Sequence, residues 1–228
     1  MMDLIATHRR ALAGALDGLT DDQWRGKSLC AGWTPAHVLA HQTMPFRITE
    51  QDYMAGLQRC GGDFTRFSDE MAEADSKLPP AELVAVLRDN AANPWSPPGG
   101  GLPGALCHDV IHGLDIGWPL GLAYEIPDQA MTTVLDMMTS PLALGQADVD
   151  AAEVDAAAPG ASASRATIFG FPLDGIRVLA TDLDWSGGDG SAVAGASRDL
   201  LPLLAGRRIP RECFHGEGVT RAFSLAGR

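Results

Sequence analysis

Four of the six histidines in this sequence form two pairs with the same spacing, and that spacing suits a metal ion. His37 and His41 are four residues apart, and so are His108 and His112. In a helix, residues four apart differ by about 40° around the axis and about 6 Å along it, so both imidazoles can reach one ion at about 2.0–2.1 Å. A third ligand must then come from another element.

A pair of this kind is also common on the polar face of an ordinary helix, where each imidazole is solvated or hydrogen-bonded. Two pairs on separate predicted helices favour a metal, but the spacing alone leaves both interpretations open. The metalloprotease pattern HExxH would need glutamate at position 109, where this chain has Asp109. That side chain is one methylene shorter, and we expect it to face solvent. The cysteine-rich sets typical of structural zinc are missing from the sequence, so an open, histidine-rich site fits better.

Helices are predicted around both pairs. Thr34 is a natural N-cap and Pro35 fits the first turn, so a helix should begin there, and Pro45 should kink it or end its first part. The second pair lies in a predicted helix over 103–118, where both histidines and Asp115 form a stripe beside the apolar residues. This stripe should lie at the edge of the core, where polar groups need partners.

The other elements divide the chain into two parts. Apolar periodicity predicts further helices over 2–18, 79–92 and 127–140. Alternating residues predict strands over 166–171, 175–185 and 218–225, with one helix over 195–206. We therefore expect an α+β protein with a helical domain over 1–146, a linker over 147–165 and a small α/β domain over 166–228.

Composition excludes several classes of partner. The net charge of −12 disfavours nucleic acid and anionic membrane surfaces. No apolar run approaches the roughly 20 residues of a membrane span, and the first residues do not resemble a signal peptide. We expect a soluble, cytoplasmic protein. The four cysteines are far apart, so a disulfide framework is not expected. Each can be a small buried side chain, an interpretation that fits Cys60 and Cys213 better than Cys30 and Cys107, which lie near the histidine motifs.

The segments around the histidines resemble one family. The stretch "SLCAGWTPAHVLAHQ" (28–42) resembles the GWT-x-x-D-V-x-A-H signature of proteins related to mycothiol-dependent maleylpyruvate isomerase. "HDVIHGLDIGWPLG" (108–121) is similar to their Glu-x-x-x-His-x-x-Asp element. "ATDLDWSGGDG" followed by "LLPLLAGR" resembles their small C-terminal domain, which is similar to sterol-carrier folds. The resemblance implies an N-terminal DinB-like, up-down four-helix bundle that binds a metal.

The resemblance also implies a ligand set. It places the metal ligands at His41, His108 and His112, with His108 where the family has glutamate, so the site would hold three neutral imidazoles. It makes Asp115 an outer acceptor that orients an imidazole. His37 stands where the family has aspartate, at the third position of its helix. A structural or exposed role at the helix start is one interpretation of His37, and an outer group of the site or a fourth metal ligand are the others.

The activity implied by the resemblance is thiol chemistry. We expect a divalent metal, zinc first with nickel or iron as alternatives, which lowers the pKa of mycothiol supplied as co-substrate. The thiol would add to a conjugated double bond and leave after rotation, or be transferred to a small electrophile. Arg47 and Arg221 are candidates for binding carboxylates of the thiol or substrate, with an ordinary surface charge as the alternative for each. The alternatives are a metal-binding regulatory module without turnover and a protein with an empty site; a homodimer is compatible with each.

Overall fold

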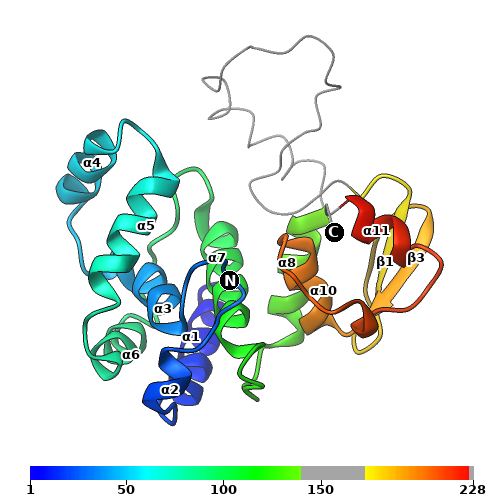
Figure 1. The fold of residues 1–228 in the computed structure, drawn as a ribbon, viewed down its shortest axis with the longest axis horizontal. Coiled ribbons are helices and arrows are strands. Elements are labelled where there is room, and N and C mark those ends of the chain that lie inside the picture. Colours follow the sequence, from blue (N-terminus) through cyan, green and yellow to red (C-terminus); the bar gives the residue numbers. More distant parts are fainter. Residues whose placement is uncertain (140–172, 226–228) are drawn as a thin grey trace. The chain divides into compact units, whose positions relative to one another are not determined.

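The computed structural model describes residues 1–139 and 173–225, and the chain divides into two compact units, Met1–Ala130 and Met131–Arg228 (Figure 1). The helices of the first unit are α1 (Met2–Leu16), α2 (Asp21–Trp24), α3 (Pro35–Thr43), α4 (Glu50–Arg59), α5 (Phe64–Asp75), α6 (Pro80–Asp89) and α7 (Gly101–Gly117), with the 3₁₀ turn η1 (Met44–Phe46) after α3. Helix α8 (Asp128–Thr139) spans the division between the units.

Capping side chains explain where several of these helices begin. Thr20 accepts a hydrogen bond from the backbone N–H of Gln23, whose side chain accepts one from Thr20 in return. Thr34 precedes Pro35 at the start of α3, as predicted, and Pro45 ends that helix in a 3₁₀ turn. Asp63 caps α5, a helix that the periodicity analysis does not predict.

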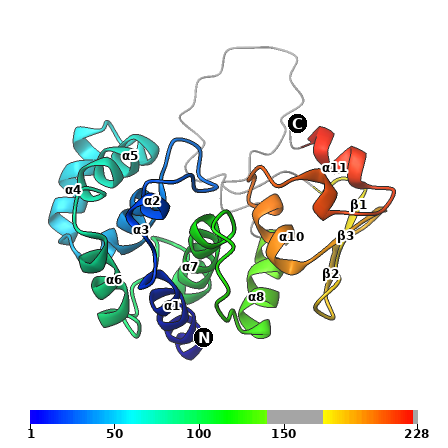
Figure 2. The same ribbon diagram turned by 60° about the horizontal axis from the view of Figure 1, so that its bottom comes forward.

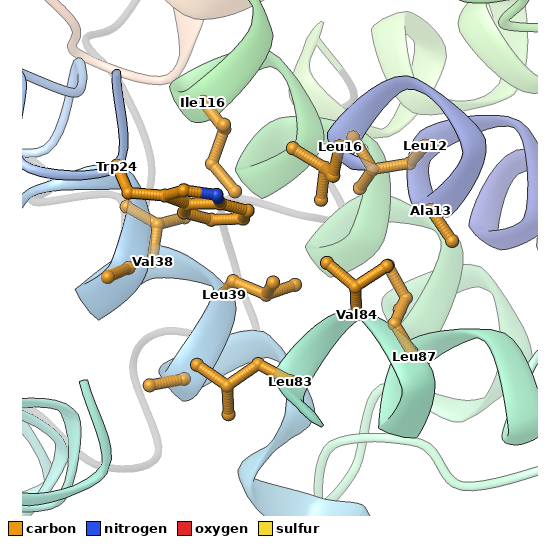
Figure 3. Close-up of a cluster of buried hydrophobic side chains, with 12 residues drawn as sticks. Leu12, Ala13, Leu16, Trp24, Val38, Leu39, Leu83, Val84, Leu87 and Ile116 are labelled. Atoms are coloured by element: carbon orange, nitrogen blue, oxygen red, sulfur yellow. The ribbon is translucent and has the colours of Figure 1, made fainter. Parts of the chain in front are cut away.

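Four helices form the predicted bundle. α1 and α3 each pack against both α6 and α7, and the views of Figures 1 and 2 show these helices grouped together. Leucines of α1, α3 and α6 meet at the centre together with Trp24 and Ile116, and all of these side chains are buried (Figure 3). The predicted α+β class with an N-terminal helical bundle is confirmed.

Gly56 lets α4 pack closely against α5. A methyl group at this position would overlap the Phe67 ring, whose Cδ2 would lie 2.9 Å away. Phe67 is only 1% exposed and cannot move aside without disturbing its neighbours. We expect Gly56→Ala to lower the free energy of unfolding by about 1–3 kcal/mol, as overpacking does.

The matched control for this substitution is Gly14→Ala in α1. Gly14 is an exposed helical residue with open space around its Cα. Alanine there should raise the free energy of unfolding by up to about 1 kcal/mol through helix propensity. Urea denaturation of both variants checks the pair, and equal effects of the two substitutions would contradict the packing argument.

The second unit contains a small mixed sheet. Its strands are β1 (Ile176–Ala180), β2 (Ser186–Gly188) and β3 (Ser191–Gly195), in the order β2-β1-β3, with β1 antiparallel to β2 and parallel to β3. Helix α10 (Ser197–Leu204) follows as predicted, despite Pro202. The 3₁₀ turn η4 (Arg211–Cys213) and α11 (Val219–Leu225) end the described chain.

The strand predicted over 218–225 is wrong, because this segment forms α11. Its buried residues are Val219, Ala222 and Phe223. Residues i, i+3 and i+4 lie on one face of a helix, so this spacing is helical. The edge of β3 is already used: Ala194 bridges His215, and the N–H of Gly218 donates to the carbonyl of Ala192. A further strand therefore has no free edge of β3 at this place.

Two other predicted segments, the linker over 147–165 and the strand over 166–171, lie outside the described residues. The division between the units falls at Ala130, earlier than the predicted domain boundary at 146. Within the second unit, Trp185 Nε1 donates to Asp136 Oδ1 of α8 at 2.8 Å. Among the described residues, no helix combines the length and the apolar character needed for a membrane span.

Candidate metal centre

Three helices of the first unit bring one cluster of polar side chains together. α3 contributes His41, α7 contributes His108 and His112 from successive turns, and α5 contributes Ser68. α3 packs against both α5 and α7, so it holds His41 between them. The length of α7 from Ala105 to Gly117 is buried almost throughout, which fixes the direction of its histidine stripe.

The three imidazoles converge on one point. His108 Nε2 lies 3.3 Å from His41 Nε2, and the ring centroids are 4.8–5.2 Å apart. One nitrogen from each ring lies within 4.8 Å of the others. Tetrahedral bonds of about 2.0–2.1 Å separate two ligand nitrogens by about 3.4 Å, so the spacing of His41 and His108 already suits a shared ion.

The outward nitrogens of the rings have oxygen partners. His41 Nδ1 lies 2.9 Å from Ser68 Oγ, and His112 Nδ1 lies 2.9 Å from Asp115 Oδ2. His108 Nδ1 lies 3.4 Å from Asp109 Oδ1. Because a carboxylate accepts hydrogen bonds, Nδ1 of His108 and of His112 is the donor, and the Ser68 hydroxyl can accept from His41 in the same way. In each ring whose Nδ1 carries the proton, Nε2 has its lone pair free for a metal at the centre. The donor set therefore fits a divalent metal with three histidine ligands.

The centre is buried but not sealed. His41 and His112 are 7% and 8% exposed, while the His108 side chain is 14% exposed. Two half-buried tryptophans flank the rings: Trp33 lies 5.2 Å from His41 and Trp95 lies 5.7 Å from His108, between ring centroids. His108 is therefore the most exposed of the three rings.

Asp109 does not face solvent, and that expectation is wrong. It is 1% exposed and accepts a hydrogen bond of 2.6 Å from Arg9 Nε, which is itself fully buried. Burial would raise the pKa of the Asp109 carboxyl, but the hydrogen bond with His108 and the charge of Arg9 hold that pKa below its ordinary value. The carboxylate is used inside the protein, where it links α1 to α7.

The loop before α3 adds a thiol that sequence reasoning did not connect to the site. Cys30 Sγ donates to Asp115 Oδ2 at 3.0 Å, and the N–H of Leu29 donates to the Asp115 carbonyl at 2.9 Å. Eighty-five positions separate Cys30 from Asp115 in the chain. The only sequence signal was the location of Cys30 within the same motif as His41.

The other predicted site residues are not part of this cluster. His37 Nδ1 lies 2.7 Å from Thr34 Oγ1 at the start of α3, and its Nε2 lies 3.0 Å from Glu73 Oε2. Arg47 donates to Asp75 Oδ2 at 2.7 Å and to the Ala40 carbonyl. Arg221, in the second unit, donates to the backbone carbonyl of Asp174 at 2.7 Å.

Ser68 allows a test of the outward hydrogen bonds. We expect Ser68→Ala to weaken metal binding by about 10-fold or more, because His41 loses the partner that orients its ring. Ser76→Ala in the cap of the same helix is the control, since Ser76 Oγ donates only to the Glu73 carbonyl. Competition with a chromophoric chelator measures both affinities. Equal affinities for the two variants would contradict the assigned role.

Comparison with known proteins supports the resemblance noted in the sequence. Residues 5–93 match the model of the mycothiol maleylpyruvate isomerase N-terminal domain; this stretch contains His41 and Ser68 and ends before α7. Two crystal structures of the mycothiol-dependent maleylpyruvate isomerase, one of a histidine-to-alanine variant, are similar to this chain at 16% identity, with TM-scores of 0.56 for the variant and 0.55. Each comparison covers 95% of this chain and 91% of that chain, so the fold is shared along nearly the whole length. No curated protein matched significantly.

Proposed function

We propose, from the resemblance of its N-terminal domain to that of mycothiol-dependent maleylpyruvate isomerase, that this chain is a metal- and thiol-dependent enzyme. Its reaction is the cis–trans isomerisation of a small electrophile by mycothiol, or the transfer of that thiol to one. One observation carries the proposal: three imidazoles from two helices direct nitrogens at a common point while each Nδ1 lies beside an oxygen acceptor.

In this proposal His41, His108 and His112 hold the metal. Three neutral nitrogen ligands suit zinc, and they suit nickel and iron(II) as well. When bound, the ion supplies a thiolate near neutral pH, because coordination lowers the pKa of a thiol. Three protein ligands leave a fourth position for that sulfur.

The chain's own side chains set the charge and shape of this position. The charge of Asp109 is offset by Arg9, whereas Asp115 places a buried carboxylate directly against His112. Asp115 therefore offsets part of the charge of a divalent cation and keeps the His112 ring in place. Trp33 and Trp95 offer flat apolar surfaces to a conjugated substrate.

Arg47 and Arg221 remain proposals for binding carboxylates of the thiol or substrate. Arg47 would have to exchange its bond to Asp75, and Arg221 its bond to the Asp174 carbonyl. A homodimer likewise remains a prediction, which sedimentation would test.

A metal-binding module without turnover is the second candidate. The observation favouring it is His108, a neutral ligand where the resembling family has glutamate, which makes the site more positive by one charge. A more positive site binds a thiolate more tightly. Tight binding of the thiol slows its release and its transfer, so the difference can favour binding over catalysis.

Calorimetry with mycothiol tests the proposal. Protein stripped by a chelator and reloaded with one equivalent of Zn²⁺ should bind mycothiol, whereas stripped protein and S-methylated mycothiol should show no binding. Turnover of maleylpyruvate, followed by its absorbance, then separates enzyme from binding module. If mycothiol binds equally well to stripped and reloaded protein, the metal does not activate the thiol. If binding requires the metal but no tested cis-enedione is turned over, the second candidate is favoured.

A further inference from the structure

Behind the three-histidine centre lies a second group of metal-ligating side chains. We propose that Cys30, His112 and Asp115 form a separate position for a thiophilic divalent cation, such as Cd²⁺ or Zn²⁺ in excess of the first equivalent. It uses Nδ1 of His112, whereas the first centre uses Nε2. The inference needs no thiol reaction and does not depend on the proposed function.

The donors are already close together. One atom from each of Cys30, His112 and Asp115 lies within 4.8 Å of the others. Asp115 Oδ2 stands between the other two donors, 3.0 Å from Cys30 Sγ and 2.9 Å from His112 Nδ1. Metal bonds of about 2.0–2.3 Å separate neighbouring donors by about 3.4–3.8 Å, so small side-chain rotations would admit an ion.

The backbone around Cys30 is fixed. The N–H of Leu29 donates to the Asp115 carbonyl at 2.9 Å, which ties the loop to α7. Ser28 Oγ donates to the Trp33 carbonyl at 2.7 Å and accepts from the N–H of Cys30 at 3.1 Å. The fold therefore holds the backbone that carries the thiol beside Asp115.

Burial and donor chemistry point to a cation of intermediate softness. Asp115 is fully buried, while Cys30 is partly exposed, so an ion can enter at the thiol. Sulfur, nitrogen and oxygen together suit Zn²⁺ and Cd²⁺ better than Mg²⁺ or Ca²⁺, which prefer oxygen alone. A thiolate and a carboxylate would balance the two charges of the ion, and the displaced protons would pass to solvent.

Because His112 belongs to both centres, an ion in the second position affects the first. Asp115 cannot accept the N–H of His112 once Nδ1 binds an ion. A filled second position therefore replaces the hydrogen bond that orients His112 with a metal bond. The Nδ1 proton of His112 passes to solvent, and the ring then bridges the two ions as an imidazolate. Surplus thiophilic metal is expected to alter the first centre through this one ring.

Titration of metal-free, reduced protein with Cd²⁺ tests the inference, with stoichiometry from calorimetry and the near-ultraviolet charge-transfer absorption of a cadmium–thiolate bond. The whole chain should bind two ions and show the absorption of one thiolate. Cys30→Ser should bind one ion without that absorption. Cys213→Ser, at the other partly exposed cysteine, should behave as the unchanged protein.

The two centres can be separated by variants. His41→Ala should keep the thiolate absorption and lose the other ion, and His112→Ala should lose both. If the unchanged protein shows no thiolate absorption, or Cys30→Ser retains it, the second position is overturned. If the absorption behaves as expected but His41→Ala still binds two ions, the three-histidine centre fails and the second position stands. Cys30→Ala repeats the test without a hydroxyl, and circular dichroism verifies the fold of each variant.

Discussion

The His41→Ala variant is expected to bind Zn²⁺ at least about 100-fold more weakly than the unchanged protein. His41 is the one ligand that α3 gives to the centre, and its Nε2 lies 3.3 Å from that of His108. Removal of an outer hydrogen-bond partner already costs about 10–100-fold in metal affinity, so loss of a direct ligand should cost more. Metal analysis after dialysis and chelator competition measure the change.

His37→Ala is the matched control on the same helix. His37 is the other half of the first histidine pair, but its nitrogens lie against Thr34 and Glu73 instead of the centre. The variant should keep its metal and lose about 0.5–2 kcal/mol of stability, because the start of α3 loses a capping group. If His37→Ala lost its metal as His41→Ala does, the assignment of ligands would be wrong.

The Arg9→Met variant is expected to lose about 3–5 kcal/mol in the free energy of unfolding, because it leaves a buried carboxylate without its cation. Arg9 and Asp109 are 0% and 1% exposed, and Nη1 of Arg9 also donates to the carbonyls of Asn90 and Asn93. The side chain thus joins α1, α7 and the loop after α6. Urea denaturation of metal-free protein measures this effect without a contribution from metal binding.

Two further variants test whether the loss of stability in Arg9→Met comes from the unpaired buried carboxylate of Asp109. Arg88→Met breaks an exposed ion pair with Asp17 and should change stability by no more than about 1 kcal/mol. The double variant Arg9→Met, Asp109→Leu should recover part of the loss, since an apolar pair leaves no buried charge. A loss below about 1 kcal/mol for Arg9→Met would show that Asp109 is solvated or protonated instead.

Much of the helical fold follows from local signals, and the failures have identifiable causes. Thr34, Pro35 and Pro45 bound α3 correctly because capping and proline chemistry act within a few residues. The segment 219–225 defeats such reasoning, since its apolar spacing fits both a strand and a helix. In the structure the edge of β3 is bridged by His215, a tertiary contact that no local pattern in 219–225 indicates.

In the site, too, residues close together in the sequence were predictable and contacts between distant residues were not. Spacing on α7 aligns His108 with His112, and the family resemblance adds His41 from α3. Neither reveals Arg9 beside Asp109 or Cys30 beside Asp115, because these partners are 100 and 85 positions apart. The sequence predicts that Asp109 faces solvent, whereas the packing of α1 against α7 buries it.

We expect one metal ion to be bound among His41, His108 and His112. A crystal of protein loaded with one equivalent of Zn²⁺, measured at wavelengths on both sides of the zinc absorption edge, tests it most directly. We expect a single anomalous peak about 2.0–2.1 Å from one nitrogen of each ring, with room for a fourth ligand on its open side. An occupied zinc peak elsewhere, or fully loaded protein in which His41 does not approach the ion, would contradict the account.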